Sequence, residues 1–552
     1  MLMILSLLVG YISLGMNVSG FEIPLTYSGD GLFTSLAVKG LVDNPWIFEN
    51  DYLGFPYGSN LYGFPSSDSG NFILLKLLSF FTKKYQLILN AFILMSFPLN
   101  ALTSFWFFIK HSISTSASFV GAFLFAFLPF HFLRIDHTFL IMYFSIPVFF
   151  HFGLRIIEAN PIFFDHDKFW KKCLVGFFLL GMSCFGVYFS FFGVLVFIVS
   201  GILGFFQNKK MQNVYSALTC IFLIGLGVLL NIAPNLYLSS TQPDIFPISR
   251  AAYDTETFGL KFSQMILPRP NHRLESFSRL DKTYNYAFLV GSDLEKSNLG
   301  LIGAFGFLLL VASWFVPFNN EGLGKDFLLM SKISLFLLLF CTIGGFGSVF
   351  SLMISPQIRA LNRVSIFLGF SSLFTVLIFI DVFFKNYRHR IMICLSFLFL
   401  GLWDQTGVVD KMKILKNKSA FNSDAQFIKL IENKYPRIGI YQLPYVAFPE
   451  SADAFQMTAY EHFKGYLHSR NLKWSYACFR GTDCDLGFRI LSSKPITKQI
   501  MTIKKYGFKG IYINRSGFED EAFKLENDLK TLLGEKSILT SPDATKSFFY
   551  LN

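Results

Sequence analysis

Charged residues are scarce in this chain. Only 15% of its 552 residues are Asp, Glu, Lys or Arg, whereas an average soluble domain carries about a quarter. Apolar residues make up 53% of the chain, and apolar runs of about 20 residues, the length that crosses a bilayer core, recur before Trp403. This composition excludes an ordinary soluble protein and predicts a polytopic membrane protein.

The signatures of several enzyme classes are also missing. The sequence has no Walker loop, no GxGxxG after an expected strand, no HExxH and no GxSxG. Chemistry driven by ATP or NAD, or at a zinc-protease site, is therefore not expected, and we predict no cofactor. The seven cysteines include no CxxC pair. Cys478 and Cys484 share one polar stretch, which could hold a local disulfide if it lies outside the cytoplasm.

The basic residues predict the topology. The net charge of +12 comes from short Lys and Arg clusters between apolar runs, a pattern typical of cytoplasmic loops and not of nucleic-acid binding. Eleven spans are expected, with the N-terminus inside and the C-terminus outside, and the first is a retained span rather than a signal peptide. The apolar run 172–206 leaves open one span or a hairpin of two, and the charges favour two. The spans are 2–19, 86–109, 115–132, 138–156, 172–187, 189–206, 213–236, 297–316, 327–347, 364–384 and 390–403.

This topology divides the chain near Trp403. Residues 1–403 are expected to form an all-α membrane module of about 11 transmembrane helices, with long outer loops at 21–70 and 237–296. Residues 404–552 have the composition of a soluble domain. Alternating helix and strand patterns, with strands expected at 437–446 and 507–515, predict a small α/β domain on the outer face.

Two carboxylates stand out in the first outer loop. Asp30 lies between Gly29 and Gly31, and Asp68 lies between Ser67 and Ser69. Small neighbours allow a substrate to approach a carboxyl group closely, and an acid in such a loop is a candidate general base. The alternative is that Asp30 only caps the helix expected from Leu32.

Cationic side chains gather at the outer ends of the spans. Arg and protonated His can hold the oxygens of a phosphate, and the Arg fork does so in a bidentate way. Anchoring to ordinary lipid headgroups is the alternative for any one of them. The candidates for the phosphate of a lipid-linked donor are Arg134, His137, Arg269, His272, Arg273 and Arg363.

At this point the motifs match a known class. They are GDGLF (29–33), LGFPYGSNLYGFPSSD (53–68), FAFLPFHFLRIDHTFL (125–140), LPRPNHR (267–273), IRALNR (358–363), QLPYVAFPE (442–450), YLHSRNLKWSYA (466–477) and GFKGIYINRSGFED (507–520). In this order they resemble the GT-C class of membrane glycosyltransferases, which take sugar from a polyprenyl-phosphate donor. Within that class, the chain looks most like bacterial multi-span glucosyl and sugar transferases that act on surface polysaccharide.

The resemblance implies roles for several residues. GT-C enzymes carry a catalytic acid in the first outer loop, which falls on Asp30, and Asp68 is the candidate for a second acid. Gly follows Asp30 where a second acid would make a pair, and we predict no metal. The outer domain would bind the acceptor or cover the site. Its candidate acceptor-binding residues are His468, Arg470, Trp474 and Tyr476, joined by Glu295, with core packing as the alternative for Trp474.

The expected function is transfer of a sugar, glucose among the candidates, from a polyprenyl phosphate to a surface glycan such as O-antigen. The reaction would occur at the outer face of the bacterial inner membrane, where the C-terminal domain would be periplasmic. The expected partners are the lipid-linked donor, the glycan acceptor, membrane lipids and a helper flippase, with no nucleic acid. The alternatives are a flippase or glycan transporter, and a polysaccharide polymerase or ligase. No inverted repeat, which many transporters show, is visible in the sequence.

Overall fold

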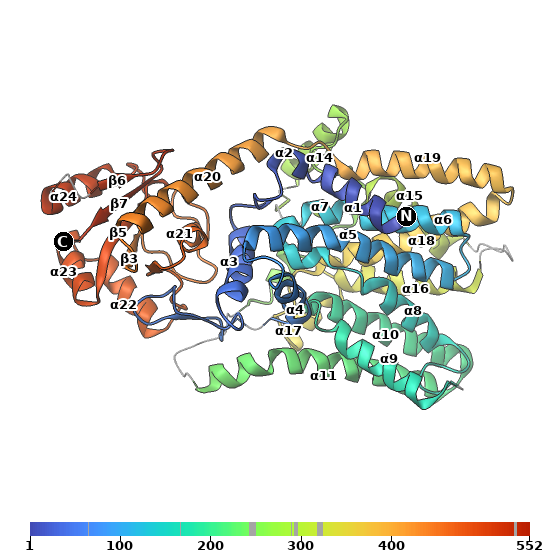
Figure 1. Ribbon diagram of the computed structural model, residues 1–552. Helices are drawn as coiled ribbons and strands as arrows, with labels where there is room; N and C mark the ends of the chain where they lie inside the picture. Colours follow the sequence, from blue (N-terminus) through green and yellow to red (C-terminus); the bar gives the residue numbers. More distant parts are fainter. Residues whose placement is uncertain are drawn as a thin grey trace.

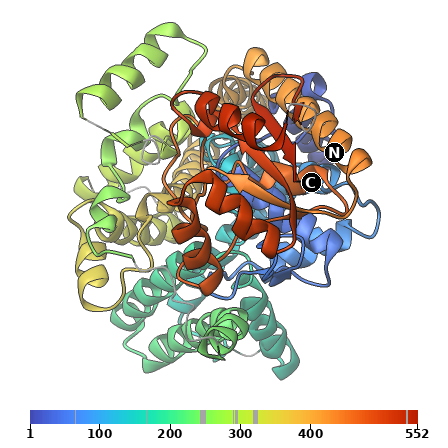
Figure 2. The same ribbon diagram turned by 90° about the vertical axis from the view of Figure 1, so that its left-hand side faces the viewer.

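The computed structural model of the protein describes residues 1–64, 66–165, 167–241, 250–288, 290–291, 296–316, 324–534 and 538–551. A bundle of helices and a smaller α/β unit lie end to end, with α3 (Asp30–Asp43) between them (Figure 1). Figure 2 shows the α/β unit in front of the bundle, so that it covers one end of the helices. The first outer loop therefore lies where the two parts meet.

The bundle contains helices in all the apolar segments that the sequence indicates. Six helical stretches among the described residues are long and apolar enough to cross a membrane, and a seventh is added if the bent pair α19–α20 is one span. The count of eleven spans stays a prediction. The bundle helices are α1 (Leu2–Ser13), α2 (Met16–Ser19), α4 (Ser69–Leu78), α5 (Tyr85–Lys110), α6 (Thr115–Ala126), α7 (Pro129–Leu133), η1 (Ile135–Ile141), α8 (Ile146–Ile157), α9 (Phe169–Met182), α10 (Val187–Asn208), α11 (Met211–Thr241), α15 (Gly300–Phe315), α16 (Gly324–Cys341), α18 (Ser365–Phe383) and α19 (Tyr387–Thr406).

Two details of the bundle bear on the site. The apolar run 172–206 is divided into α9 and α10 at residues 183–186, as the charge pattern favours. Shorter helices connect the long ones in the second half of the bundle. They are α12 (Asp254–Thr257), α13 (Phe262–Ile266), α14 (Glu275–Ala287), α17 (Phe346–Met353) and η3 (Leu361–Val364).

The C-terminal part contains a five-stranded sheet of order β4-β3-β5-β7-β6. Strand β3 runs parallel to β4 and β5, and β7 runs antiparallel to β5 and β6. The strands expected at 437–446 and 507–515 are β3 and β5. The elements are α20 (Lys411–Lys434), β3 (Gly439–Leu443), α21 (Phe463–His468), β4 (Lys473–Trp474), α22 (Asp483–Ser492), α23 (Ile496–Lys505), β5 (Phe508–Asn514), η4 (Arg515–Gly517), α24 (Phe523–Leu533), β6 (Ile538–Thr540) and β7 (Lys546–Tyr550).

The first outer loop extends this sheet. After strand β1 (Glu49–Asn50), which pairs with β2 (Ser59–Asn60), the backbone runs along β4. Trp474 N donates to Tyr52 O at 2.8 Å, Gly54 N donates to Tyr476 O at 2.8 Å, and Phe55 N donates to Trp474 O at 3.0 Å. These bonds satisfy a sheet edge that would otherwise be open. The proposed boundary at 403 therefore does not separate the loop from the C-terminal part.

A buried polar network joins the same two regions. The Tyr27 hydroxyl donates to Asp424 Oδ2 at 2.9 Å and lies 2.7 Å from His468 Nε2. Lys546 Nζ lies 2.7 Å from Asp424 Oδ1, and the side chains of Lys546 and Asp424 are only 6% and 1% exposed. Because both charges are buried, each depends on the other for compensation.

We predict that Asp424→Asn destabilises the protein by about 3 kcal/mol, because it leaves the buried Lys546 ammonium without its nearest carboxylate. The measurement is the unfolding midpoint of the protein in nanodiscs. The double variant Asp424→Asn/Lys546→Met removes both charges and should recover most of the loss. An unchanged midpoint in Asp424→Asn would contradict the pairing.

Candidate active site

Asp30 is the first residue of α3, and it does not cap that helix. The N-cap is Gly29, whose φ of +51° turns the chain into the helix, and no side chain bonds to the helix N–H groups at this end. The capping interpretation of Asp30 is therefore wrong. Its side chain is 50% exposed, and Oδ2 lies 3.1 Å from His137 Nε2. The carboxylate is thus available to a substrate.

His137 reaches Asp30 because the chain between α7 and α8 is irregular. The segment Ile135–Ile141 is a 3₁₀ helix that is broken at His137, whose φ of −97° and ψ of +63° are not helical. Both Asp136 and His137 are thereby held beside α3. Burial, followed by the negative charge of Asp136, raises the pKa of Asp30, whereas Lys296 and Arg363 lower it. A raised pKa makes Asp30 a stronger base than an ordinary carboxylate.

The charge of Arg363 acts on both acids that the sequence indicates. Its guanidinium is 4.1 Å from the centre of the Tyr188 ring, and its charge lowers the pKa of both Asp30 and Asp68. The net pKa of Asp68 is raised, mainly by burial. Ser66 and Asn71 donate to the Asp68 carboxylate, Asn71 at 3.1 Å. The structure thus brings Asp30, His137, Arg363 and Asp68 to one region.

Two ion pairs surround this region. Arg250 makes a bidentate pair with Glu450, and Arg359 lies 3.1 Å from Asp254. Glu450 also raises the pKa of Asp30, and the charge of Asp30 in turn raises that of Tyr460. Sequence reasoning missed Arg250, Glu450 and Tyr460 as neighbours of Asp30, because they come from distant segments. The only signal was Glu450 at the end of the motif QLPYVAFPE.

The motif LPRPNHR has a structural role. His272 Nε2 lies 3.0 Å from Asp404 Oδ1, and the two side chains are 0% and 1% exposed. Arg269 and Arg273 donate to the carbonyl oxygens of Gln405 and Gly407, at the C-terminus of α19. Cations there satisfy free carbonyl groups and the helix dipole. Arg269 and His272 are buried in these contacts and do not present their charges to a donor phosphate, whereas Arg273 is exposed and its role in binding a donor stays a prediction.

Two further candidate site residues remain, Arg134 and Glu295. Arg134 is completely buried, with its guanidinium 5.6 Å from the centre of the Phe130 ring. Its role in binding a donor stays a prediction. Glu295 lies outside the described residues. Within the described ranges, no group of three or more His, Cys, Asp and Glu side chains could hold a metal ion.

The residues predicted to form a sugar-binding surface in the C-terminal part do not form an accessible aromatic surface. Trp474 is 0% exposed, and its Nε1 donates to Ser469 Oγ at 3.0 Å. It therefore cannot offer a face to a sugar, and the core-packing alternative is correct. His468 belongs to the network around Tyr27, and burial lowers its pKa to about 4. Arg470 is exposed and its role stays a prediction, whereas Tyr476 is buried.

Neither a family model nor a curated protein sequence matches the chain. The crystal structure of ArnT from Cupriavidus metallidurans, bound to undecaprenyl phosphate, matches with a TM-score of 0.53 at 10% identity, over 100% of this chain and 97% of that one. Two further matches score below 0.5. An oligosaccharyltransferase from Archaeoglobus fulgidus has a TM-score of 0.46 at 14% identity, over 100% of this chain and 73% of that one. The mycobacterial arabinofuranosyltransferase AftD has 0.48 at 10%, over 93% of this chain and 35% of that one.

The chain has the GT-C fold. The resemblance seen in the sequence motifs is thus confirmed at the level of the fold. In this fold, α3, which begins at Asp30, lies between the helix bundle and the C-terminal α/β unit.

We predict that His272→Ala acts on folding and not on substrate affinity. The variant leaves the Asp404 carboxylate buried with only the Leu301 N–H, at 2.7 Å, and long-range charge to stabilise it. The expected cost is about 3 kcal/mol, measured as a lower unfolding midpoint. His389→Ala, at an exposed position of α19, is the control. A stable variant with weakened binding of a lipid phosphate would restore the original prediction.

We also predict that Asp30→Asn is more stable than the wild type at pH 7.5. Because folding raises the pKa of Asp30, its protonated form is favoured in the folded state. Stability is therefore lost as the pH rises above the ordinary carboxyl pKa and through the folded value. The advantage of Asp30→Asn in unfolding midpoint should be present at pH 7.5 and vanish at pH 4. Asp51→Asn, in the same loop, is the control, and an equal advantage at both pH values would contradict the shift.

Proposed function

We propose that this protein is a membrane glycosyltransferase of the GT-C type, which moves a sugar from a polyprenyl phosphate to a glycan, with Asp30 as the general base. The observation that carries the proposal is the state of Asp30. Its carboxylate takes no part in helix capping, is half exposed, and contacts His137 at 3.1 Å. A carboxylate with a raised pKa and an open side suits proton abstraction from a hydroxyl.

The proposed step balances as a single displacement. Asp30 takes the proton of the acceptor hydroxyl, and that oxygen forms a bond to the anomeric carbon of the donor sugar. The bond between this carbon and the phosphate oxygen breaks, and the electron pair leaves with the polyprenyl phosphate. The departing phosphate gains negative charge, which a nearby guanidinium stabilises in the transition state. His137, as the hydrogen-bond partner of Asp30, orients the carboxylate.

Arg363 is the proposed phosphate ligand. It lies within η3, is partly exposed, and is close enough to Asp30 to lower its pKa. Tyr188 supports its guanidinium from one face, which leaves its N–H groups directed sideways. The similar ArnT structure contains undecaprenyl phosphate, and we propose a polyprenyl-phosphate donor for this chain as well.

The finer features of the proposal follow the sequence resemblance. The sugar is glucose or a related hexose, the acceptor is a surface glycan such as O-antigen, and a separate flippase supplies the donor. The chain spans the bacterial inner membrane several times, with the N-terminus inside. The C-terminal α/β unit is a periplasmic domain. The disulfide between Cys478 and Cys484 supports this placement, because such bonds persist in oxidising compartments.

The test is transfer of radiolabelled sugar from a panel of polyprenyl-phosphate hexoses by the purified protein in nanodiscs. We predict that Asp30→Asn lowers the rate by a factor on the order of 10³, the usual contribution of a general base. Arg363→Gln should lower the rate at every donor concentration, because it removes charge from the leaving phosphate. Asp51→Asn and Arg279→Gln, an exposed arginine in the outer loop on α14, are the matched controls.

The outcomes separate the alternatives. Label on a monomeric acceptor with the wild type alone supports the proposal, whereas long polymeric products would indicate a polymerase. Full activity of Asp30→Asn would exclude Asp30 as the base. Donor movement across vesicle membranes without transfer of label would replace the proposal with a flippase.

A further inference from the structure

The three parallel strands of the C-terminal sheet begin at one edge, and that edge is rich in cations. Gly439, at the start of β3, pairs with Lys473 of β4 and with Phe508 of β5, so the amino ends of these strands are level. Six exposed cations lie around these strand starts. They are Lys434, Arg437, Arg470, Lys473, Lys505 and Lys509, and we call this surface the basic edge.

The cations of the basic edge are not neutralised by ion pairs. Among the described residues none of the six has a carboxylate partner, whereas Arg515 pairs with Glu526 and Lys546 pairs with Asp424 in the same part of the chain. The segment 486–518, which supplies Lys505 and Lys509, contains no Asp or Glu. A group of like charges raises the local electrostatic potential and attracts ions of the opposite sign. The basic edge therefore suits a ligand with several negative groups.

Two acids in neighbouring segments do not cancel this charge. Glu432 Oε1 accepts from the backbone N–H groups of Arg470 and Asn471 at 2.8 and 2.6 Å. Asp51 is exposed in the first outer loop, just before Tyr52, whose carbonyl accepts from Trp474 N. Six cations against these two acids leave the basic edge positive.

Helix dipoles explain only part of the basic edge. Lys434 and Lys505 lie in the last turns of α20 and α23, where a cation also stabilises the helix C-terminus. Arg437, Lys473 and Lys509 lie on no helix. These three cations have no such structural role, so they are the residues on which a test should act.

Aromatic rings lie between the cations. Lys434 Nζ is 5.4 Å from the centre of the Tyr435 ring, and this ring stacks on Tyr550 at 4.2 Å. Lys473 Nζ is 5.6 Å from the centre of the Phe55 ring. Charged and aromatic side chains thus alternate along the edge.

Two of the aromatic side chains are open to solvent. Tyr57 and Tyr506 are 58% and 43% exposed, and their ring centres lie 6.3 Å apart. They adjoin the basic edge, because the Phe55 ring lies 5.0 Å from that of Phe508. Exposed tyrosines offer an apolar face together with a hydroxyl group, which suits the apolar face and the hydroxyls of a sugar ring.

The basic edge lies at the end of the C-terminal part that is away from the helix bundle. Leu551 N donates to Lys509 O at 2.9 Å, so the C-terminus marks this edge. Figure 1 shows the C-terminus at the end opposite the bundle, and in Figure 2 the same end faces the viewer. A surface in this position does not meet the headgroups of the membrane that the bundle spans.

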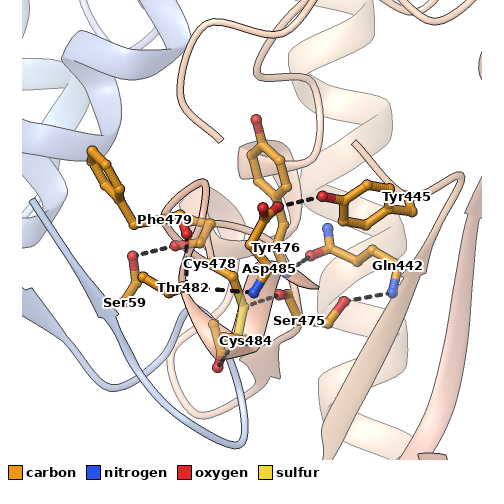
Figure 3. Close-up of a disulfide and its surroundings, with 12 residues drawn as sticks. Ser59, Gln442, Tyr445, Ser475, Tyr476, Cys478, Phe479, Thr482, Cys484 and Asp485 are labelled. Atoms are coloured by element: carbon orange, nitrogen blue, oxygen red, sulfur yellow. Dashed lines mark hydrogen bonds between the residues drawn. A yellow bond between two sulfur atoms is a disulfide. The ribbon is translucent and has the colours of Figure 1, made fainter. Parts of the chain in front are cut away.

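The carboxyl ends of the same strands are filled by protein. The disulfide between Cys478 and Cys484 lies there, and Gln442 N donates to Ser475 Oγ at 2.9 Å (Figure 3). All four side chains are buried. Although α/β folds commonly bind ligands at the carboxyl ends of their strands, in this sheet it is the amino ends that present accessible charged and aromatic side chains.

We propose that the basic edge binds a stretch of an anionic glycan, a chain of sugar rings that carry carboxylate or phosphate groups. The cations hold the anionic groups, and the exposed tyrosines contact the sugar rings. Its assignment to the acceptor rests on the proposed function: the basic edge would hold a distant part of the acceptor while the reacting end reaches Asp30. Glycan binding itself does not depend on that function.

The test is fluorescence anisotropy of a labelled oligogalacturonate with the full chain in nanodiscs of zwitterionic lipid. The wild type should bind it, and binding should weaken as salt is added. Arg437→Gln/Lys473→Gln/Lys509→Gln should bind about tenfold more weakly, because several exposed ion pairs of modest strength are lost together. The control Lys494→Gln/Lys498→Gln/Lys524→Gln removes the same charge from exposed positions near the starts of α23 and α24, and should bind as the wild type does.

A second comparison separates a glycan from an acidic protein. Poly-glutamate of equal charge should bind to the wild type more weakly than oligogalacturonate, because it has no sugar rings. Tyr57→Ser/Tyr506→Ser should weaken binding of oligogalacturonate and leave that of poly-glutamate unchanged. Equal binding of the two polymers would overturn the proposal in favour of an acidic protein partner. A neutral malto-oligosaccharide that binds as tightly as oligogalacturonate would overturn the requirement for negative charge.

The remaining outcomes also decide. No binding by the wild type, or equal binding by Arg437→Gln/Lys473→Gln/Lys509→Gln, would overturn the proposal. The unfolding midpoint of this variant should stay unchanged, and a lower midpoint would assign the three cations to folding instead. Transfer by the wild type without binding of oligogalacturonate would overturn the basic edge alone. Binding without transfer would overturn the proposed function and leave the glycan surface in place.

Discussion

The position of Asp30 depends on the hydrogen bonds between the first outer loop and the C-terminal sheet. Three backbone bonds add Tyr52–Phe55 to β4, and the Phe55 ring packs so closely on Gly439 that a Cβ there would lie 2.4 Å from it. On the other side of the loop, Tyr27 bonds to Asp424. The loop has little regular structure, but these bonds fix it to the C-terminal part both before and after α3. Helix α3 begins at Asp30, the candidate catalytic residue. Backbone pairing suits this task, because it specifies register as well as contact.

The surroundings of Asp30 come from segments that are far apart in the chain, and charge brings them together. Glu450 follows β3, Arg250 precedes α12, and Arg363 precedes α18. Surface ion pairs contribute only about 0–1 kcal/mol each, so these pairs add little to stability. Their effect is electrostatic and positional: Asp136 and Glu450 raise the pKa of Asp30, whereas Arg363 and Lys296 lower it. The balance leaves a carboxylate with a raised pKa within electrostatic reach of the Arg363 guanidinium.

The sequence was informative where the chemistry is local and misleading where it depends on distant partners. Asp30 could be identified because small neighbours and a position between apolar segments mark an accessible acid. Apolar length and charge clusters indicated the helices, including the division of the run 172–206 into two. Arg269 and His272 were misassigned because their partners, at the end of α19, lie more than 130 residues away, and a buried cation has the same sequence pattern as a phosphate ligand. Trp474 was misassigned for a related reason: an aromatic residue among polar ones can belong to a core or to a surface, and only the burial of its neighbours decides.

The aromatic cluster around Phe448 has a consequence for how the two halves of the molecule work together. Phe33 is on α3 with Asp30, whereas Phe448 and Tyr476 belong to the C-terminal part. Packed aromatic rings transmit displacement, because protein interiors have few voids into which a side chain can move. A displacement of Phe448 or Tyr476 in the C-terminal part would therefore be transmitted through Phe33 to the start of α3, which carries Asp30.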